Sequence, residues 1–203
     1  MKLLLINSNE GNSFVGYSDK KKEIVCYAKD FIAEDDSEKK PNKLIVCLNE
    51  IKQKTGKDYS SIDAVAVTIG PGSFTGIRVC LSIAKGAAFA LDKKIIPINN
   101  FEIALQSMEN YESGGSYCIM IPAKEPEYYF SIFENGVFKE SGCAVECEIQ
   151  SRFSESEKVI YKFTEPEKEL RTMLEITKKK FGEGEIFNGI EIQPLYLKDF
   201  GKN

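Results

Sequence analysis

Residues 63–91 constrain the fold of this 203-residue chain more than any other stretch. Residues 63–69 are apolar and partly β-branched, which is typical of a strand in the buried interior of a sheet. Three glycines and one proline follow within residues 70–76, so the chain must turn there before the apolar residues 74–91. We therefore predict a strand, a shaped glycine loop and a helix at the centre of an α/β fold.

The glycine loop has two interpretations. As a structural turn, it lets Ser73 or Thr75 cap the next helix and packs that helix on the sheet. As a weak anion site, it uses the free N–H groups at the start of the helix. A dinucleotide fingerprint needs glycine where Thr75 stands, and a P-loop needs Gly-Lys-Ser/Thr, so neither nucleotide motif is present. The residues concerned are Gly70, Pro71, Gly72, Ser73, Phe74, Thr75, Gly76 and Arg78.

The predicted helix at 74–91 is apolar on nearly every face, because Arg78 and Lys85 are its only charges before Asp92. A single core-facing side would leave large apolar groups in water, so a second layer, a partner chain or a second copy should cover it. We predict that the partner-facing residues are Ile77, Leu81, Ala84, Lys85, Ala87 and Ala88. On this prediction, arginine at Ala84 or Ala87 breaks association and leaves the fold intact.

Hydrophobic periodicity and turn residues place the other elements in two lobes, 1–110 and 111–203, with the boundary in the loop at 110–116. Asn135-Gly136 predicts a hairpin in the second lobe. Asn99 or Asn100 is the expected cap of the helix that begins near residue 101. We predict strands at 2–8, 13–17, 23–29, 94–98, 117–121, 128–134 and 137–147, helices at 44–56 and 165–180, and a polar loop at 34–41.

Composition excludes several classes of function. The chain has no histidine, which removes Ser-His and Cys-His catalytic devices and the commonest neutral-pH base. Its six cysteines lack metal-ligand spacing, and a zinc site at Cys143 and Cys147 has no histidine and no second cysteine pair nearby. A formal charge of −4 and short, separated lysine runs disfavour strong RNA binding. We expect a cytoplasmic protein with no membrane segment and no cofactor.

The run at 64–69 followed by Gly-Pro-Gly-Ser-Phe-Thr-Gly-Ile-Arg resembles the signature of the bacterial TsaB (YeaZ) family. The resemblance covers about residues 63–105 and returns weakly at 194–198, Pro-Leu-Tyr-Leu-Lys. It implies the two-lobed actin/sugar-kinase/Hsp70-like fold, with a mixed sheet and flanking helices in the N-terminal lobe and a smaller diverged C-terminal lobe.

The resemblance also implies a function. Family members act in forming N6-threonylcarbamoyladenosine at position 37 of tRNAs that read codons beginning with A. The TsaB-like subunit is a non-catalytic scaffold that binds TsaD, the catalytic paralogue, and the ATPase TsaE joins the complex. In that family the helix after the glycine loop serves the homodimer and the TsaD interface, so we expect tRNA contact to be indirect.

Departures from the family pattern argue further against chemistry in this chain. Asn7 stands where relatives usually have the first-strand aspartate, and an amide supplies no charge to hold magnesium. Pro122 replaces another aspartate, while Lys124 and Glu127 match the family's basic and acidic positions. One rival interpretation is a small ATPase or kinase of the same fold that uses the glycine loop for phosphate, with Asp63 or Glu127 handling magnesium or a proton. A peptidase is the other rival, but the chain lacks a histidine metal site and a recognisable nucleophile and base.

Overall fold

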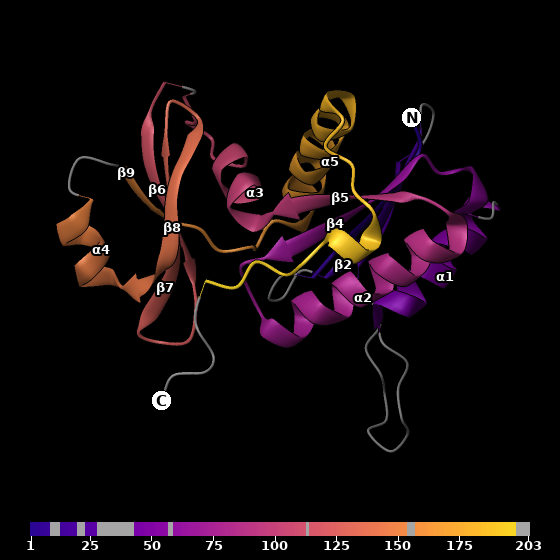
Figure 1. Ribbon diagram of the computed structural model, residues 1–203, viewed down its shortest axis with the longest axis horizontal. Helices are drawn as coiled ribbons and strands as arrows, with labels where there is room; N and C mark the ends of the chain where they lie inside the picture. Colours follow the sequence, from indigo (N-terminus) through magenta and orange to yellow (C-terminus); the bar gives the residue numbers. More distant parts are fainter. Residues whose placement is uncertain are drawn as a thin grey trace, which may run out of the picture.

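The computed structural model describes residues 1–8, 13–19, 23–27, 43–56, 59–112, 114–153 and 157–197. Figure 1 shows two sheets side by side, each with its own helices, joined through α3 and the segments around it. The predicted loop at 34–41, the end of the strand predicted at 23–29, and Lys198 lie outside the described residues.

The first sheet has the strand order β3-β2-β1-β4-β5. β1 pairs with β2 antiparallel and with β4 parallel, and β4 pairs with β5 parallel, so the sheet is mixed as predicted. Alternate side chains of its central strands enter two different cores, which explains why these strands are apolar along their whole length. The strands are β1 Leu3–Asn7, β2 Phe14–Ser18, β3 Glu23–Tyr27, β4 Ala64–Gly70 and β5 Lys94–Asn99.

Helices cover both faces of the first sheet. α1 (Lys43–Thr55) and α2 (Phe74–Leu91) bury their apolar sides against one face. α5 (Pro166–Glu183) and part of α3 (Asn100–Gln106) cover the other face (Figure 1). A short 3-10 turn, η2 (Tyr59–Ser61), leads into β4. Asn99 caps α3 by accepting the N–H of Phe101 at 2.9 Å, which decides between the two predicted caps.

The second sheet has the order β8-β7-β6-β9. Its strands are β6 Ser116–Pro122, β7 Glu127–Glu134, β8 Val137–Val145 and β9 Glu157–Ile160. The Asn135-Gly136 hairpin is confirmed, and both residues have the positive φ that such a turn requires, 52° and 72°. The strand predicted at 137–147 is wrong at its end, because Cys147 belongs to helix α4 (Glu146–Arg152).

The C-terminal part of the chain returns to the first sheet. Met173, Leu174 and Ile176 of α5 pack in the same core as Leu3 and Leu5 of β1. The 3-10 turn η3 (Gly189–Glu191) lies against α2, and Ile192 enters the core beneath that helix. Four apolar side chains from the stretch assigned to the second lobe, Met173, Leu174, Ile176 and Ile192, are therefore buried against the first sheet, while the division into lobes 1–110 and 111–203 stays a prediction.

The cysteines are distributed as reduced core residues would be. Cys26, Cys47, Cys80 and Cys118 are buried, Cys143 is half-buried and Cys147 is exposed, and none of them forms a disulfide. Burial raises the pKa of Cys80 to about 12, although the hydroxyl of Thr68 opposes the shift. The Cys80 thiol is therefore protonated near neutral pH and is a poor nucleophile.

Candidate functional site

The glycine loop lies at the carboxyl end of β4, between the two lobes. Gly70 has a φ of 106°, and the Gly70–Pro71 peptide is cis. The Pro71 carbonyl accepts a hydrogen bond of 2.8 Å from Nδ2 of Asn100, a buried residue at the start of α3. The φ of Gly70 is one that residues with a side chain rarely adopt, and an added Cβ would lie 2.8 Å from Cδ1 of Ile77 in the first turn of α2, so glycine is favoured here.

Ser73 caps α2. Its hydroxyl accepts the N–H of Gly76 at 3.3 Å, whereas Thr75 is the exposed second residue of the helix. A Cβ at Gly76 would lie 2.8 Å from Oγ of Ser8, so this glycine lets the helix approach the end of β1. These contacts support the structural interpretation of the loop; the anion-binding interpretation stays a prediction.

The C-terminal segment lies across the glycine loop, which the sequence did not predict. The N–H of Leu195 donates to the carbonyl of Ile69 at 2.8 Å. The next residue, Tyr196, stacks with Phe74 at a centroid distance of 5.5 Å and accepts a 2.7 Å hydrogen bond from Nε of Arg78. The resemblance at 194–198 was the available signal, but it did not say which residues this segment contacts.

A cavity of about 270 Å³ separates the glycine loop from the second lobe. This volume falls just below the range usual for small-molecule sites, about 300–1,000 Å³. Its lining is formed by Pro71, Gly72, Ile121, Pro122, Tyr161, Lys162, Phe163 and Thr164. Most of these side chains are apolar, and Lys162 is the only charged residue among them, so the described lining offers one cation and no carboxylate.

Asp63, one of the two carboxyl groups considered for an ATPase, lies away from the glycine loop. Asp63 accepts the N–H of Lys2 at 2.7 Å, which places it at the amino end of β4. A seven-residue strand, roughly 20 Å long, separates it from the loop. Glu127 begins β7, where its N–H donates to the Lys124 carbonyl at 3.0 Å. No cluster of three or more potential metal ligands occurs within the described residues.

Four of the six residues predicted to face a partner are instead buried. Ile77, Leu81, Ala84 and Ala88 are at most 4% exposed. Leu81, Ala84 and Ala88 pack in the chain's own core under the first sheet, and the side chain of Ile77 lies against Gly70 of the loop. The prediction is corrected for these four, because a partner cannot reach them in this fold. Lys85 and Ala87 are half-buried, and Lys85 lies against Gly189 of η3.

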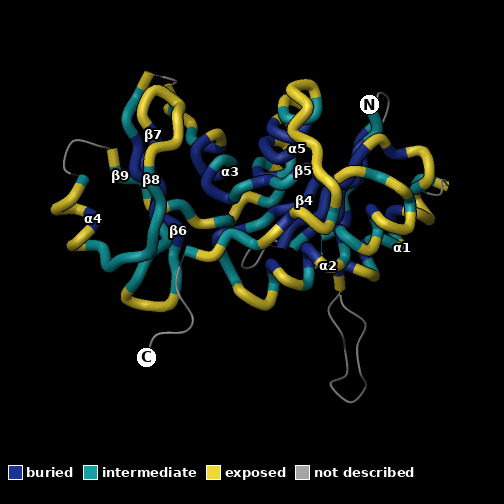
Figure 2. Tube along the Cα trace, in the orientation of Figure 1, coloured by how far each residue is buried: buried dark blue, intermediate teal, exposed yellow. Residues whose placement is uncertain are grey.

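The outward face of α2 carries a different set of residues. Small exposed residues follow one another at four-residue spacing, Ser82, Gly86 and Ala90, and Phe89 beside them is 91% exposed. Val79 and Ile83 are half-exposed on the same side. Figure 2 shows this face of the helix along the lower edge of the molecule. α2 is also long and apolar enough, by length and composition alone, to cross a membrane, but its buried stripe packs on the sheet.

Comparison with known proteins gives the family. A model described as "TsaD: tRNA N6-adenosine threonylcarbamoyltransferase" matches residues 32–193, most of the chain. The chain belongs to this family. Within it, the predicted TsaB (YeaZ) assignment is confirmed. The chain is 36% identical over 89 residues to the Haemophilus influenzae "tRNA threonylcarbamoyladenosine biosynthesis protein TsaB", covering 44% of this chain and 38% of the relative.

Further similarities are found among the catalytic transferases of the family and among solved structures. An Erythrobacter litoralis "tRNA N6-adenosine threonylcarbamoyltransferase" is 40% identical over 60 residues, covering 30% of this chain and 17% of that protein. The chain thus matches well under half the length of these curated relatives. The structure titled "YeaZ from Pseudomonas aeruginosa" superposes with a TM-score of 0.70 at 17% identity, over 97% of this chain and 99% of that one. The predicted two-lobed actin/sugar-kinase/Hsp70-like fold is confirmed.

A substitution at Gly70 tests the geometry of the loop that marks this TsaB-like chain. Gly70→Ala is expected to lower the free energy of unfolding by about 1–3 kcal/mol, because a residue with a side chain is strained at this φ. The new Cβ would also lie 3.3 Å from the carbonyl oxygen of Leu195. Urea denaturation measures the change. Gly114→Ala is the control, since nothing lies within 4 Å of an added Cβ there, and an equal effect of both substitutions would contradict the loop geometry.

Proposed function

We propose that this chain is a non-catalytic partner subunit in the formation of N6-threonylcarbamoyladenosine at position 37 of tRNAs that read codons beginning with A. In this proposal it binds and activates a TsaD-type catalytic subunit. Membership of the TsaD/TsaB family and the likeness to the Haemophilus influenzae threonylcarbamoyladenosine biosynthesis protein support the pathway. The YeaZ-like fold over nearly the whole chain supports a subunit of the TsaB type rather than the TsaD type.

The outward face of α2 is the observation that carries the scaffold role. A phenylalanine that is 91% exposed beside small residues is costly to leave in water and is suited to close packing against another helix. No described element of the chain's own fold covers Phe89. We therefore assign the partner-facing surface to Thr75, Val79, Ser82, Ile83, Gly86, Phe89 and Ala90, in place of the four buried positions.

The residues at the ends of β1, β4 and β6 support a non-catalytic role. Asn7 ends β1 as a 1%-exposed amide, and an amide supplies no negative charge for a metal-bound phosphate. Pro122 ends β6 on the wall of the cavity between the lobes. Asp63 lies at the far end of β4 from the glycine loop, so its carboxylate is not placed to hold a metal or take a proton there.

The remaining parts of the proposal follow the family. A TsaE-type ATPase joins through the complex, tRNA is contacted only indirectly, and the protein works in the cytoplasm without a cofactor. The free protein can pair with a second copy through the same face of α2, because a small-residue face suits a helix of either chain.

Light scattering on the purified chain, alone and mixed with the TsaD-type protein of the same organism, tests the proposal. A threonylcarbamoyl-transfer assay of each protein and of the mixture accompanies it. We expect a stable complex, and activity that the mixture has and this chain lacks. Absence of association, together with ATP binding or turnover by this chain alone, would favour the ATPase interpretation of the glycine loop instead.

A further inference from the structure

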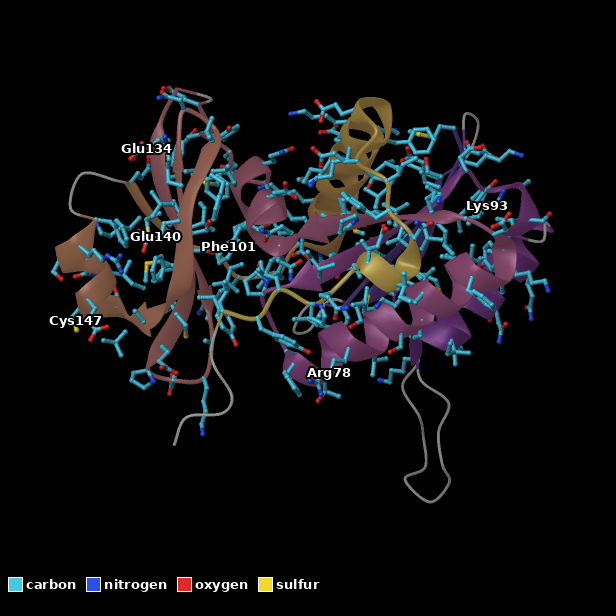
Figure 3. The ribbon with its side chains drawn as sticks, in the orientation of Figure 1. Arg78, Lys93, Phe101, Glu134, Glu140 and Cys147 are labelled. Carbon is cyan, nitrogen blue, oxygen red and sulfur yellow. The ribbon has the colours of Figure 1, made fainter. Side chains whose placement is uncertain are left out.

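Arg78 is exposed, yet its side chain is held in place from two sides. Its Nε–H donates to the Tyr196 hydroxyl at 2.7 Å, and its guanidinium carbon lies 3.7 Å from the centre of the Phe74 ring. The Tyr196 ring is 5.6 Å from the same carbon. Figure 3 shows Arg78 on the outer side of α2, near the start of the helix. A long, charged surface side chain is therefore fixed by the helix and the C-terminal segment together.

Among the described residues, the charge that is fixed in this way has no ion-pair partner. The ion pairs found among the described residues join other lysines and arginines to glutamates, and Arg78 belongs to none of them. Arg78 also lies near the amino end of α2, where the helix dipole is positive and disfavours a cation. The positive potential of this corner thus favours an anion from outside the chain.

The geometry of the guanidinium indicates what kind of anion fits. Within the described part of the chain, the hydrogen bond of Arg78 uses Nε and leaves the two terminal nitrogens available. These nitrogens form the planar fork that matches a carboxylate. A tyrosine and an arginine beside an apolar helix face are also the residue types that contribute most at protein interfaces.

A protein carboxylate fits this corner better than RNA does. The Phe74 face is already covered by Arg78 at 3.7 Å, so it offers no platform for an unpaired base. Binding to phosphates needs several cations together, whereas the chain is acidic overall with a formal charge of −4. Thr75, one turn before Val79, continues the same exposed surface onto the outward face of α2.

We propose that Arg78, held by Phe74 and Tyr196, is an anchor that binds an aspartate or glutamate of the partner protein at the amino end of the α2 surface. This inference rests on the proposed function, because the partner is the TsaD-type subunit. It adds the C-terminal segment to the interface: Tyr196 positions Arg78.

Isothermal titration calorimetry tests the anchor. The TsaD-type protein is titrated with each purified variant at low and at high salt, and the dissociation constant is measured. We expect Arg78→Gln to weaken association about tenfold and to reduce its dependence on salt, because one charge-assisted pair is lost. Arg78→Lys should lose less than Arg78→Gln, since it keeps the charge but not the fork. Tyr196→Phe removes the hydroxyl and keeps the ring, so a smaller loss than for Arg78→Gln is expected.

The control is Lys139→Gln, which removes a positive charge from the second lobe, away from α2. It should leave the dissociation constant unchanged, and each variant should keep the wild-type melting temperature. Wild-type affinity and salt dependence in Arg78→Gln would overturn the anchor and leave the proposed function intact. A loss of tRNA binding in place of partner binding would also overturn it, and failure of the wild-type protein to associate would overturn both proposals.

Discussion

Replacing Ala84 by arginine is expected to lower the free energy of unfolding by about 3–5 kcal/mol, because it buries an unpaired charge. Ala84 is 0% exposed and lies in the core with Val65, Cys80 and Ile95. For a chain of this length the loss corresponds to a fall in melting temperature on the order of 10 °C. Thermal unfolding followed by circular dichroism measures it.

Ala90→Arg is the matched control, since it places the same side chain on the exposed side of the same helix. Its melting temperature should stay within a few degrees of the wild-type value. The register of α2 would be contradicted if Ala84→Arg melted like Ala90→Arg. The same pair separates the two assignments of this helix, because the sequence alone placed Ala84 on the side that faces a partner.

The rotation of α2 about its axis is the part of the site that the sequence could not supply. The strand, the loop and the helix bounds at 74–91 follow from local signals: a β-branched run, glycines and a capping serine. The helix is apolar on nearly every side, so periodicity does not choose between Ala84 and Ile83 as the core-facing residue. Packing decides it, because small Ala84 and Ala88 let the helix lie close to the sheet.

Long-range packing accounts for the other differences. The local pattern predicted α5, but its place on the first sheet depends on contacts with residues more than 150 positions earlier, such as Leu3 and Leu5. α4 was missed because its N-cap, Val145, makes no side-chain cap bond and therefore gives no start signal. The stack of Phe74, Arg78 and Tyr196 joins residues 118 positions apart, and no pattern in either segment predicts it.

Arginine at Gly86 is expected to weaken association with the TsaD-type subunit by more than 100-fold while leaving the fold intact. Gly86 is exposed between Ser82 and Ala90, and nothing in the chain lies within 4 Å of an added Cβ. Arginine is also a better helix former than glycine, by roughly 0.5–1 kcal/mol, so stability should not fall. At a close helix contact, however, the new side chain holds the partner away and buries a charge.

Gly182→Arg provides the matched control for this last substitution. Gly182 is also an exposed helix glycine with open space around it, but it lies near the end of α5 on the other face of the sheet. Both variants gain the same charge, so a general electrostatic effect would weaken association equally in the two. Loss of the complex in Gly86→Arg alone, at unchanged melting temperature, is the result that a partner surface on α2 requires. Wild-type association in Gly86→Arg would move the partner to another face of the protein.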